Sequence, residues 1–282
     1  MKTSFTFTLL LACTMMNGQE GLGIIKPSLL EITEKASAFD AKVKEAYMET
    51  ASAFDAKIKE TYKDYPLPGD PSSDEEISEE IKESRNIAER RWDKFIGLCQ
   101  SHSYGEALDC YLEDFADFFL YLRVSDDRYE FLSSILLPLM RECRGEEFAR
   151  KRYIEDLAFE KTTEEFIIAI NEDREGYVPE AYPDVVRDLG HALAADGRLD
   201  EALALAEDLL NPALGSAGSG AYAGARYIWG IFEKFGSAGD RDKYYEAIQR
   251  LVSRDKDLTD EDREYILHDL FASTEKTMKS NL

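Results

Sequence analysis

Residues 183–212 read PDVVRDLGHALAADGRLDEALALAEDLLNP, and this stretch decides the fold. Apolar residues recur every three or four positions on both sides of Gly197, which predicts two amphipathic helices joined by a tight turn. Small residues on the first helix, at Gly190 or Ala194, leave room for the second helix to approach closely at Ala202. Leucines fill the space around that contact: Leu189, Leu193, Leu199 and Leu209.

This helical pair resembles one tetratricopeptide repeat. A single such pair cannot bury its own apolar face, so flanking pairs are required. The resemblance implies an α-solenoid whose concave face, lined by first helices, holds an extended peptide or a partner's helix. On this chain, the residues expected on that face come from the 183–212 pair and from the next one: Arg187, His191, Asp196, Arg226 and Glu233.

Two further segments are similar to the same repeat. In residues 92–111, Ala107 stands at the close contact, but Phe95 replaces the expected small residue, so we expect a wider spacing of the helices. Residues 227–251 follow the pattern with a longer turn. Any amphipathic helical hairpin with alanine and glycine at its crossing would share these features. We therefore predict an all-α fold of stacked antiparallel helical hairpins over residues 74–282.

The apolar spacing and the breaks between segments predict ten helices in this domain. Gly145, Gly197 and residues 236–239 are expected at helix ends, Thr163 and Thr259 as N-caps, and Pro138 as a kink. The expected ranges are 74–100, 104–122, 126–143, 146–158, 163–172, 182–196, 199–210, 221–236, 240–253 and 260–277.

A near-exact duplication precedes this domain. The sequence ASAFDAKVKEAY at residues 36–47 returns as ASAFDAKIKETY at residues 51–62, fifteen residues later. Both copies carry apolar residues at helical spacing, which predicts a long amphipathic helix over residues 19–63. Such a helix needs a partner for its apolar face, either within the chain, in a homo-oligomer through residues 27–63, or on a membrane surface. Prolines and a glycine in residues 64–73 predict a linker.

Residues 1–18 have a basic start and a short apolar run, which is typical of a secretory signal peptide. Cleavage after Gly18 would release a secreted or periplasmic protein. A second interpretation follows from Leu10 to Cys13, which resembles the lipobox of bacterial lipoproteins and implies a lipid on Cys13. An uncleaved segment is the third.

Charge restricts the partners. Lys and Arg number 34 against 57 Asp and Glu, a net charge of −23. Such a surface repels nucleic acid phosphates, so we expect no nucleic acid partner, and it favours cationic protein or peptide partners. An acidic surface that serves only solubility has the same composition.

Three cysteines follow the N-terminal segment: Cys99, Cys110 and Cys143. An odd number cannot pair completely within one chain. Cys99 and Cys110 fall on the two arms of an expected hairpin, where either a disulfide or two buried thiols is compatible with the sequence.

The loop at residues 171–182 resembles the calcium loop of an EF-hand. Asn171, Asp173 and Glu175 alternate, and oxygen ligands at this spacing suit calcium. Tyr182 stands where a bidentate glutamate is required, which predicts weak affinity. An ordinary acidic loop is the alternative.

None of the hydrolase motifs considered is present in the chain, and carboxylates are too numerous for any pair to indicate a catalytic site. We therefore expect a non-enzymatic, extracytoplasmic scaffold that binds a protein or peptide partner and needs no cofactor. The alternatives are a helical hydrolase or lyase of the cell envelope that uses acidic residues, and a calcium-binding module.

Overall fold

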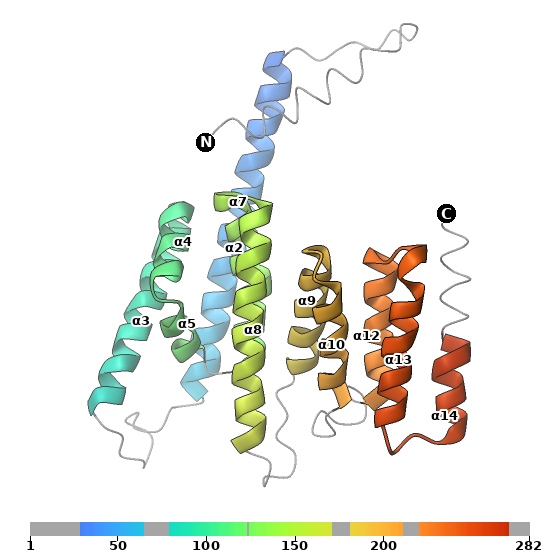
Figure 1. Ribbon diagram of the computed structural model, residues 1–282. Helices are drawn as coiled ribbons and strands as arrows, with labels where there is room; N and C mark the ends of the chain where they lie inside the picture. The colour runs from blue at the N-terminus through green and yellow to red at the C-terminus, as the bar shows by residue number, and fades with distance from the viewer. Residues whose placement is uncertain (1–28, 65–78, 123, 171–180, 211–219, 271–282) are drawn as a thin grey trace, which may run out of the picture. The chain divides into compact units, whose positions relative to one another are not determined.

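The computed structural model describes residues 29–64, 79–122, 124–170, 181–210 and 220–270. Every regular element in these ranges is helical, which confirms the all-α prediction (Figure 1). The helices of the described residues include none that combines the length and the apolar character of a membrane span. The N-terminal segment with Cys13, and the linker at residues 65–73, lie outside the described residues.

The duplicated region forms one helix, α2 (Leu29–Asp64), as its periodicity predicts. The chain divides into two units, Met1–Ala46 and Tyr47–Leu282. The second copy of the duplication therefore belongs to the larger unit. Its apolar residues Ala51, Phe54 and Ile58 are buried there.

An aromatic core joins α2 to α3 (Glu79–Gln100), α4 (Tyr104–Glu113) and α5 (Phe115–Tyr121). The sequence predicts one helix over residues 104–122, but the structure breaks it at Asp114, whose φ of −146° and ψ of 58° are not helical. The break lets α5 turn back onto α3. Phe118 on α5 thereby lies 5.4 Å from Phe95 on α3, measured between ring centroids.

The helix expected at residues 126–143 consists of three consecutive segments: α6 (Ser125–Glu130), the π-helical segment η2 (Phe131–Leu136) and α7 (Leu137–Arg144). Pro138 has no backbone N–H to donate to the preceding turn. The wide turns of η2 come directly before it, so the expected irregularity at Pro138 takes the form of a π-helical segment.

The prediction of two helices at residues 146–158 and 163–172 is wrong. Residues 146–170 form one continuous helix, α8 (Glu146–Ile170). Thr163 is therefore not an N-cap. Its Oγ1 donates to the carbonyl of Phe159, and Oγ1 of Thr162 donates to the carbonyl of Ala158, both at 3.0 Å. These bonds to residues one turn earlier satisfy the hydroxyl groups inside the helix.

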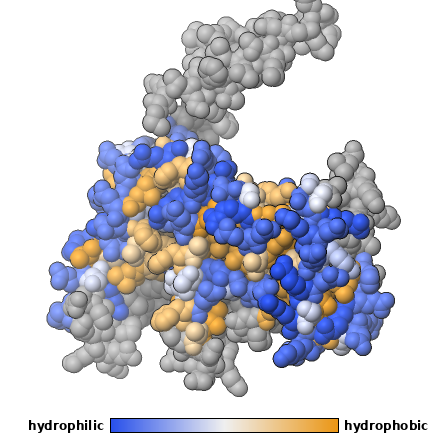
Figure 2. Space-filling view, in the orientation of Figure 1, coloured by the Kyte–Doolittle hydropathy of each residue, from blue (hydrophilic) through white to orange (hydrophobic). Residues whose placement is uncertain are grey.

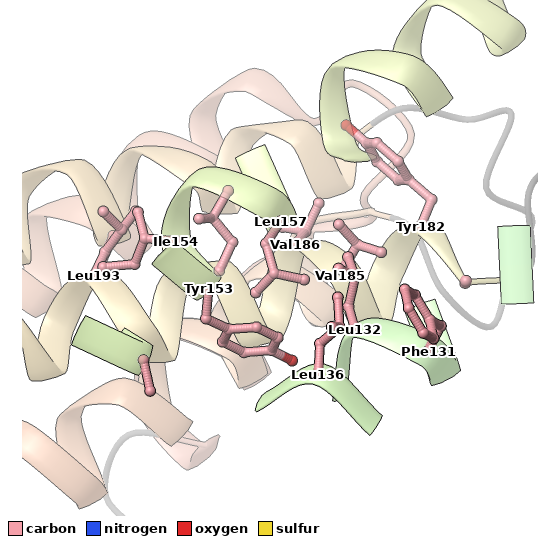
Figure 3. Packing of buried hydrophobic residues seen from close by; sticks show 14 of the residues in the cluster. Phe131, Leu132, Leu136, Tyr153, Ile154, Leu157, Tyr182, Val185, Val186 and Leu193 are labelled. Carbon is pink, nitrogen blue, oxygen red and sulfur yellow. The ribbon is translucent and has the colours of Figure 1, made fainter. Parts of the chain in front are cut away.

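The deciding stretch forms α9 (Tyr182–Ala195), α10 (Leu199–Ala204) and the 3-10 segment η3 (Leu205–Leu210). The turn falls at Gly197, whose φ of 81° favours glycine. α9 packs against α10, and Ala202 is fully buried. Figure 3 shows the core on the other side of α9, where Val185 and Val186 lie among side chains of α8 and η2.

The small residue at Gly190 serves a different contact from the expected one. α12 (Gly220–Phe235) packs against both α9 and η3, and its Tyr227 occupies the space beside Gly190. The Tyr227 hydroxyl donates to the carbonyl of Ala202. Gly190 therefore admits a side chain from the following helix, while Ala194 is only partly buried.

The C-terminal elements are η5 (Ala238–Asp240), α13 (Arg241–Arg254), α14 (Asp260–Glu264) and the π-helical segment η6 (Tyr265–Leu270). α12 packs against α13 across the turn at Gly236 to Gly239. Thr259 caps α14 as predicted, because its Oγ1 accepts a hydrogen bond from the backbone N–H of Asp262.

Cys99, Cys110 and Cys143 are present as thiols. Cys99 and Cys110 are buried on the apolar faces of α3 and α4, so the buried-thiol alternative holds and the disulfide between these arms does not form. Burial raises the pKa of the Cys99 thiol to about 12, which disfavours the reactive thiolate.

Candidate functional site

A buried charge cluster joins α6 to α8. The Arg128 Nε atom donates to both carboxylate oxygens of Glu160, at 2.8 and 2.9 Å. A second nitrogen of the same guanidinium pairs with Glu164, and a third donates to the carbonyl of Leu122 at 3.3 Å. Glu160 and Glu164 have no solvent exposure, and the Arg128 side chain is 6% exposed. We call these three residues the charge cluster.

Electrostatics in the charge cluster favour a shared proton. Burial and the hydrogen bond with Glu164 together raise the pKa of Glu160 to about 8, and Arg128 opposes the shift. At neutral pH, the protonated Glu160 therefore adds no negative charge to a region that water does not reach.

The hydrolase alternative requires two carboxylates that converge with a raised pKa. Glu160 and Glu164 converge, and the pKa of Glu160 is raised, but both carboxylates are fully buried. A substrate cannot contact them in this conformation. The cluster therefore fastens α6 to α8 and offers no acid or base to a ligand.

A second buried carboxylate, Asp156, lies on α8. Arg152 Nη2 lies 2.7 Å from Asp156 Oδ1, and burial raises the pKa of Asp156 to about 6. The Arg152 guanidinium carbon also lies 5.0 Å from the ring centroid of Phe115 and 5.7 Å from that of Tyr111. Arg152 thus supports Phe115, which belongs to a neighbouring surface rich in phenylalanine.

Phe115 and Phe119, which are partly buried, form an aromatic strip together with the exposed Phe159 and Phe166. Phe159 lies edge-on to Phe115 and Phe119, at centroid distances of 5.3 and 5.0 Å. Phe159 is 41% exposed, and Phe166, two turns further along α8, is 65% exposed. Figure 2 shows hydrophobic surface, in orange, exposed among the hydrophilic surface of the larger unit. We call Phe115, Phe119, Phe159 and Phe166 the aromatic strip.

The five residues expected on a concave face lie on α9, on α12 and at the end of α9. Arg187, Arg226 and Glu233 are exposed. Arg187 pairs with Asp184 on its own helix, and the Arg226 guanidinium carbon lies 6.0 Å from the centroid of the Tyr222 ring. These contacts of Arg187 and Arg226 lie within their own helices.

The other two residues contact neighbouring elements. Arg150 Nε on α8 lies 3.0 Å from Asp196 Oδ1, so Asp196 faces α8. His191 is half-buried, and its ring centroid lies 6.1 Å from that of Phe235 on α12. Burial lowers the pKa of His191, and nearby Lys234 lowers it further. His191 and Asp196 therefore help to pack the helices.

The proposed calcium ligands Asn171, Asp173 and Glu175 lie outside the described residues. In the part of the chain that the structure does describe, no group of three acidic, histidine or cysteine side chains is arranged to hold a metal ion.

Sequence reasoning missed both the charge cluster and the aromatic strip. A signal for the cluster exists, because Glu160 and Glu164 continue the buried row of Tyr153, Leu157 and Ile168 at steps of three and four. Two acids in an apolar row indicate a buried cation partner. The expected break in α8 concealed that row.

Comparison of the chain with models of protein families, with curated proteins and with solved structures finds no match. The functional conclusion therefore depends on the geometry of the chain itself.

Proposed function

We propose that this protein is a non-enzymatic scaffold that binds a protein or peptide partner through the aromatic strip. The observation that carries the proposal is the exposure of Phe159 and Phe166, at 41% and 65%. Aromatic side chains are enriched at protein interfaces, and contiguous exposed apolar surface is uncommon elsewhere on soluble proteins.

We further propose that the helical pairs form a solenoid similar to tetratricopeptide repeats. Support comes from three pairs of packed helices: α3 with α4, α9 with α10, and α12 with α13. Ala107, Ala202 and Ala247 are buried on the second helix of each pair. Small residues at these positions permit close approach of the helices in such repeats.

The proposed partner combines apolar side chains with positive charge. The apolar side chains would cover the aromatic strip, and the net charge of −23 would attract a basic partner and speed its association. Arg187, His191, Asp196, Arg226 and Glu233 define an alternative surface on the first helices, as the repeat resemblance implies.

Crosslinking followed by affinity purification from the cell envelope tests which surface binds. The strip variant carries Phe159→Ser and Phe166→Ser, and the first-helix variant carries Arg187→Glu and Arg226→Glu. A variant with Tyr222→Ser and Tyr265→Ser is the matched control, because these tyrosines are also exposed, at 42% and 45%.

We expect the strip variant alone to lose a partner that the unaltered protein captures. If the strip variant retains that partner and the first-helix variant loses it, the binding site lies on α9 and α12 instead. Circular dichroism of each variant shows whether the fold is retained.

We propose a secreted, periplasmic or lipid-anchored location, on the basis of residues 1–18. Intact mass measurement of the mature protein separates these forms. A chain that begins at Gln19 indicates cleavage after Gly18, whereas a chain that begins at Cys13 with added acyl mass indicates a lipid anchor. A chain that still begins at Met1 contradicts both.

A homo-oligomer through residues 27–63 stays a prediction. Residues 51–62 already bury their apolar side chains within the larger unit. Self-association would therefore use residues 27–50. Light scattering of the full chain and of a variant without residues 27–46 tests this prediction.

Weak calcium binding at Asn171, Asp173 and Glu175 is a separate proposal that rests on their spacing. Titration calorimetry with millimolar calcium tests it, with Asp173→Asn as the control. Equal heats from both proteins would dismiss it.

A further inference from the structure

The surface that holds the second copy of the duplication is aromatic at its centre. The Phe54 ring lies 6.0 Å from that of Trp92 on α3 and 6.2 Å from that of Phe131 in η2, measured between centroids. Tyr62 lies edge-on to Tyr121 on α5 at 6.0 Å. Ala51 and Ile58 are buried between these contacts.

Polar contacts surround this aromatic centre. Trp92 Nε1 donates to Asp55 at 2.8 Å, and Lys59 Nζ donates to Asp93 at 3.0 Å. Lys57 Nζ lies 3.0 Å from Asp127 and 2.6 Å from Glu130. We call the residues that receive α2 the α2-binding surface: Trp92, Asp93, Tyr121, Asp127, Glu130 and Phe131.

The first copy of the duplication carries nearly all the residues that make these contacts. The duplication has a shift of fifteen residues, so the counterparts of Phe54, Asp55 and Lys57 are Phe39, Asp40 and Lys42. The remaining pairs are Ala51 with Ala36, Ile58 with Val43, Lys59 with Lys44, and Tyr62 with Tyr47. Only one of these seven contact positions differs between the copies. Ile58 corresponds to Val43 there, and both side chains are branched and apolar.

We propose that the α2-binding surface accepts either copy, so that α2 can occupy two registers one repeat apart. A fifteen-residue shift along an α-helix corresponds to a translation of about 22 Å. The partner that this surface fits is an amphipathic helix with the pattern Ala-x-x-Phe-Asp-x-Lys-Ile/Val-Lys-x-x-Tyr. This inference does not depend on partner binding at the aromatic strip.

The chain can reach the second register without leaving its own surface. Tyr47 would take the place of Tyr62, and residues 48–78 would connect it to α3 in place of residues 63–78. Doubling the length of a connection adds only about 0.6 kcal/mol of loop-closure cost. Intramolecular exchange also avoids the cost of bringing two chains together.

The second register is the less populated one. Ile32 would replace Tyr47, whose ring lies edge-on to Tyr104 at 5.2 Å in the observed register. The contact between these rings would be lost. Val43 would also take the place of Ile58, which removes one methylene group from the core. Residues 51–62 would in turn be released from the core.

A double-mutant cycle in the full chain tests the exchange. Phe54→Ala weakens the second copy, Phe39→Ala weakens the first, and urea unfolding followed by near-ultraviolet circular dichroism reports stability. We expect Phe39→Ala alone to leave the unfolding midpoint unchanged. The double variant should lose more stability than the two single variants lose together, because the first copy can no longer replace the weakened second copy.

Phe118→Ala is the matched control for the cycle. Phe118 is equally buried in the same core but has no counterpart in the duplication. Phe39→Ala should therefore add nothing to the effect of Phe118→Ala. Strict additivity of Phe39→Ala with Phe54→Ala would overturn the proposal.

Two deletions of one repeat each provide a test that does not depend on the alanine variants. Removal of residues 36–50 leaves the second copy, and removal of residues 48–62 leaves the first. We expect both proteins to fold with the same near-ultraviolet spectrum. Folding of the first deletion protein alone would show that the first copy cannot fill the surface, which contradicts the proposal.

Protein concentration distinguishes exchange within one chain from exchange between chains. For the Phe54→Ala variant we expect a monomer by light scattering, and an unfolding midpoint that does not depend on concentration. A dimer with a concentration-dependent midpoint would overturn the intramolecular form of the proposal.

Discussion

The hydroxyl group of Tyr227 lies in the space that a side chain at Gly190 would need. A Cβ atom at Gly190 would stand 1.7 Å from the hydroxyl oxygen and 2.5 Å from the adjoining ring carbon. The same hydroxyl donates to the carbonyl of Ala202. One tyrosine of α12 is thereby fixed against both helices of the α9–α10 pair.

Gly190→Ala should destabilise the protein. The added methyl group must displace the Tyr227 ring from a buried site, and overpacking of this kind costs about 1–3 kcal/mol. The midpoint of urea unfolding measures the loss.

Gly97→Ala is the matched control, because Gly97 also lies within a helix but has no atom within 4 Å of its Cβ position. Alanine at an exposed helical site is about 0.5–1 kcal/mol more favourable than glycine. We therefore expect the control to be stabilised. Equal effects of the two substitutions would contradict the contact between Gly190 and Tyr227.

Tyr227→Phe should cost about 0.5–1.5 kcal/mol, the usual contribution of one hydrogen bond. In the Gly190→Ala background, the same substitution should cost less or become favourable. It removes the atom that lies closest to the new methyl group. A double-mutant cycle measures this coupling, and additivity within about 0.5 kcal/mol would exclude it.

Arg128→Met should destabilise the protein strongly. The substitution leaves Glu160 and Glu164 buried without their cation, and removal of one partner from a buried ion pair costs about 3–5 kcal/mol. Arg187→Met is the control, because the exposed pair of Arg187 with Asp184 contributes about 0–1 kcal/mol. Similar unfolding midpoints for the two variants would show that the charge cluster does not hold α6 to α8.

The charge cluster should make stability depend on pH. Folding raises the pKa of Glu160 to about 8, from about 4.3 in the unfolded chain. The folded state therefore binds the proton more tightly. This contribution is complete below about pH 4.3 and is lost as pH rises to about 8.

Glu160→Gln isolates that contribution, because glutamine resembles the protonated acid and does not titrate. The free energy of unfolding of the natural protein, relative to the variant, should fall between pH 5 and pH 8 and then level off. Burial raises the pKa of Asp156 to about 6, but Asp156 is present in both proteins. Its contribution therefore cancels when the two free energies of unfolding are subtracted. A constant difference across this range would mean that Glu160 titrates normally.

Local pattern was sufficient to predict much of the fold. The periodicity of residues 182–210 and the glycine at 197 predict α9, α10 and their turn, because both helices are amphipathic and the turn requires the positive φ of Gly197. The duplicated stripe similarly predicts α2. Thr259 was identifiable because a capping box is contained within four consecutive residues.

Tertiary contacts decided the elements that were predicted incorrectly. The polar sequence around Thr162 and Thr163 resembles a helix boundary, but α8 continues because both hydroxyl groups bond within the helix and Glu160 meets Arg128. Arg128 lies 32 residues earlier in the chain, so no local pattern shows the pair.

The candidate site was the least predictable feature. The exposure of Phe159 and Phe166 depends on which face of α8 the other helices cover. In sequence, these residues are indistinguishable from core phenylalanines. The repeat resemblance instead predicts binding on the first helices α9 and α12.

Site-specific photocrosslinking from position 166, in cells that produce the protein, tests directly whether a partner binds at the aromatic strip. A photoreactive phenylalanine replaces Phe166 in one protein and Tyr265, which is also exposed, in the other. We predict one dominant crosslink to a different protein from position 166 and none of that mass from position 265. The same products from both positions, or none from position 166, would contradict binding at the aromatic strip.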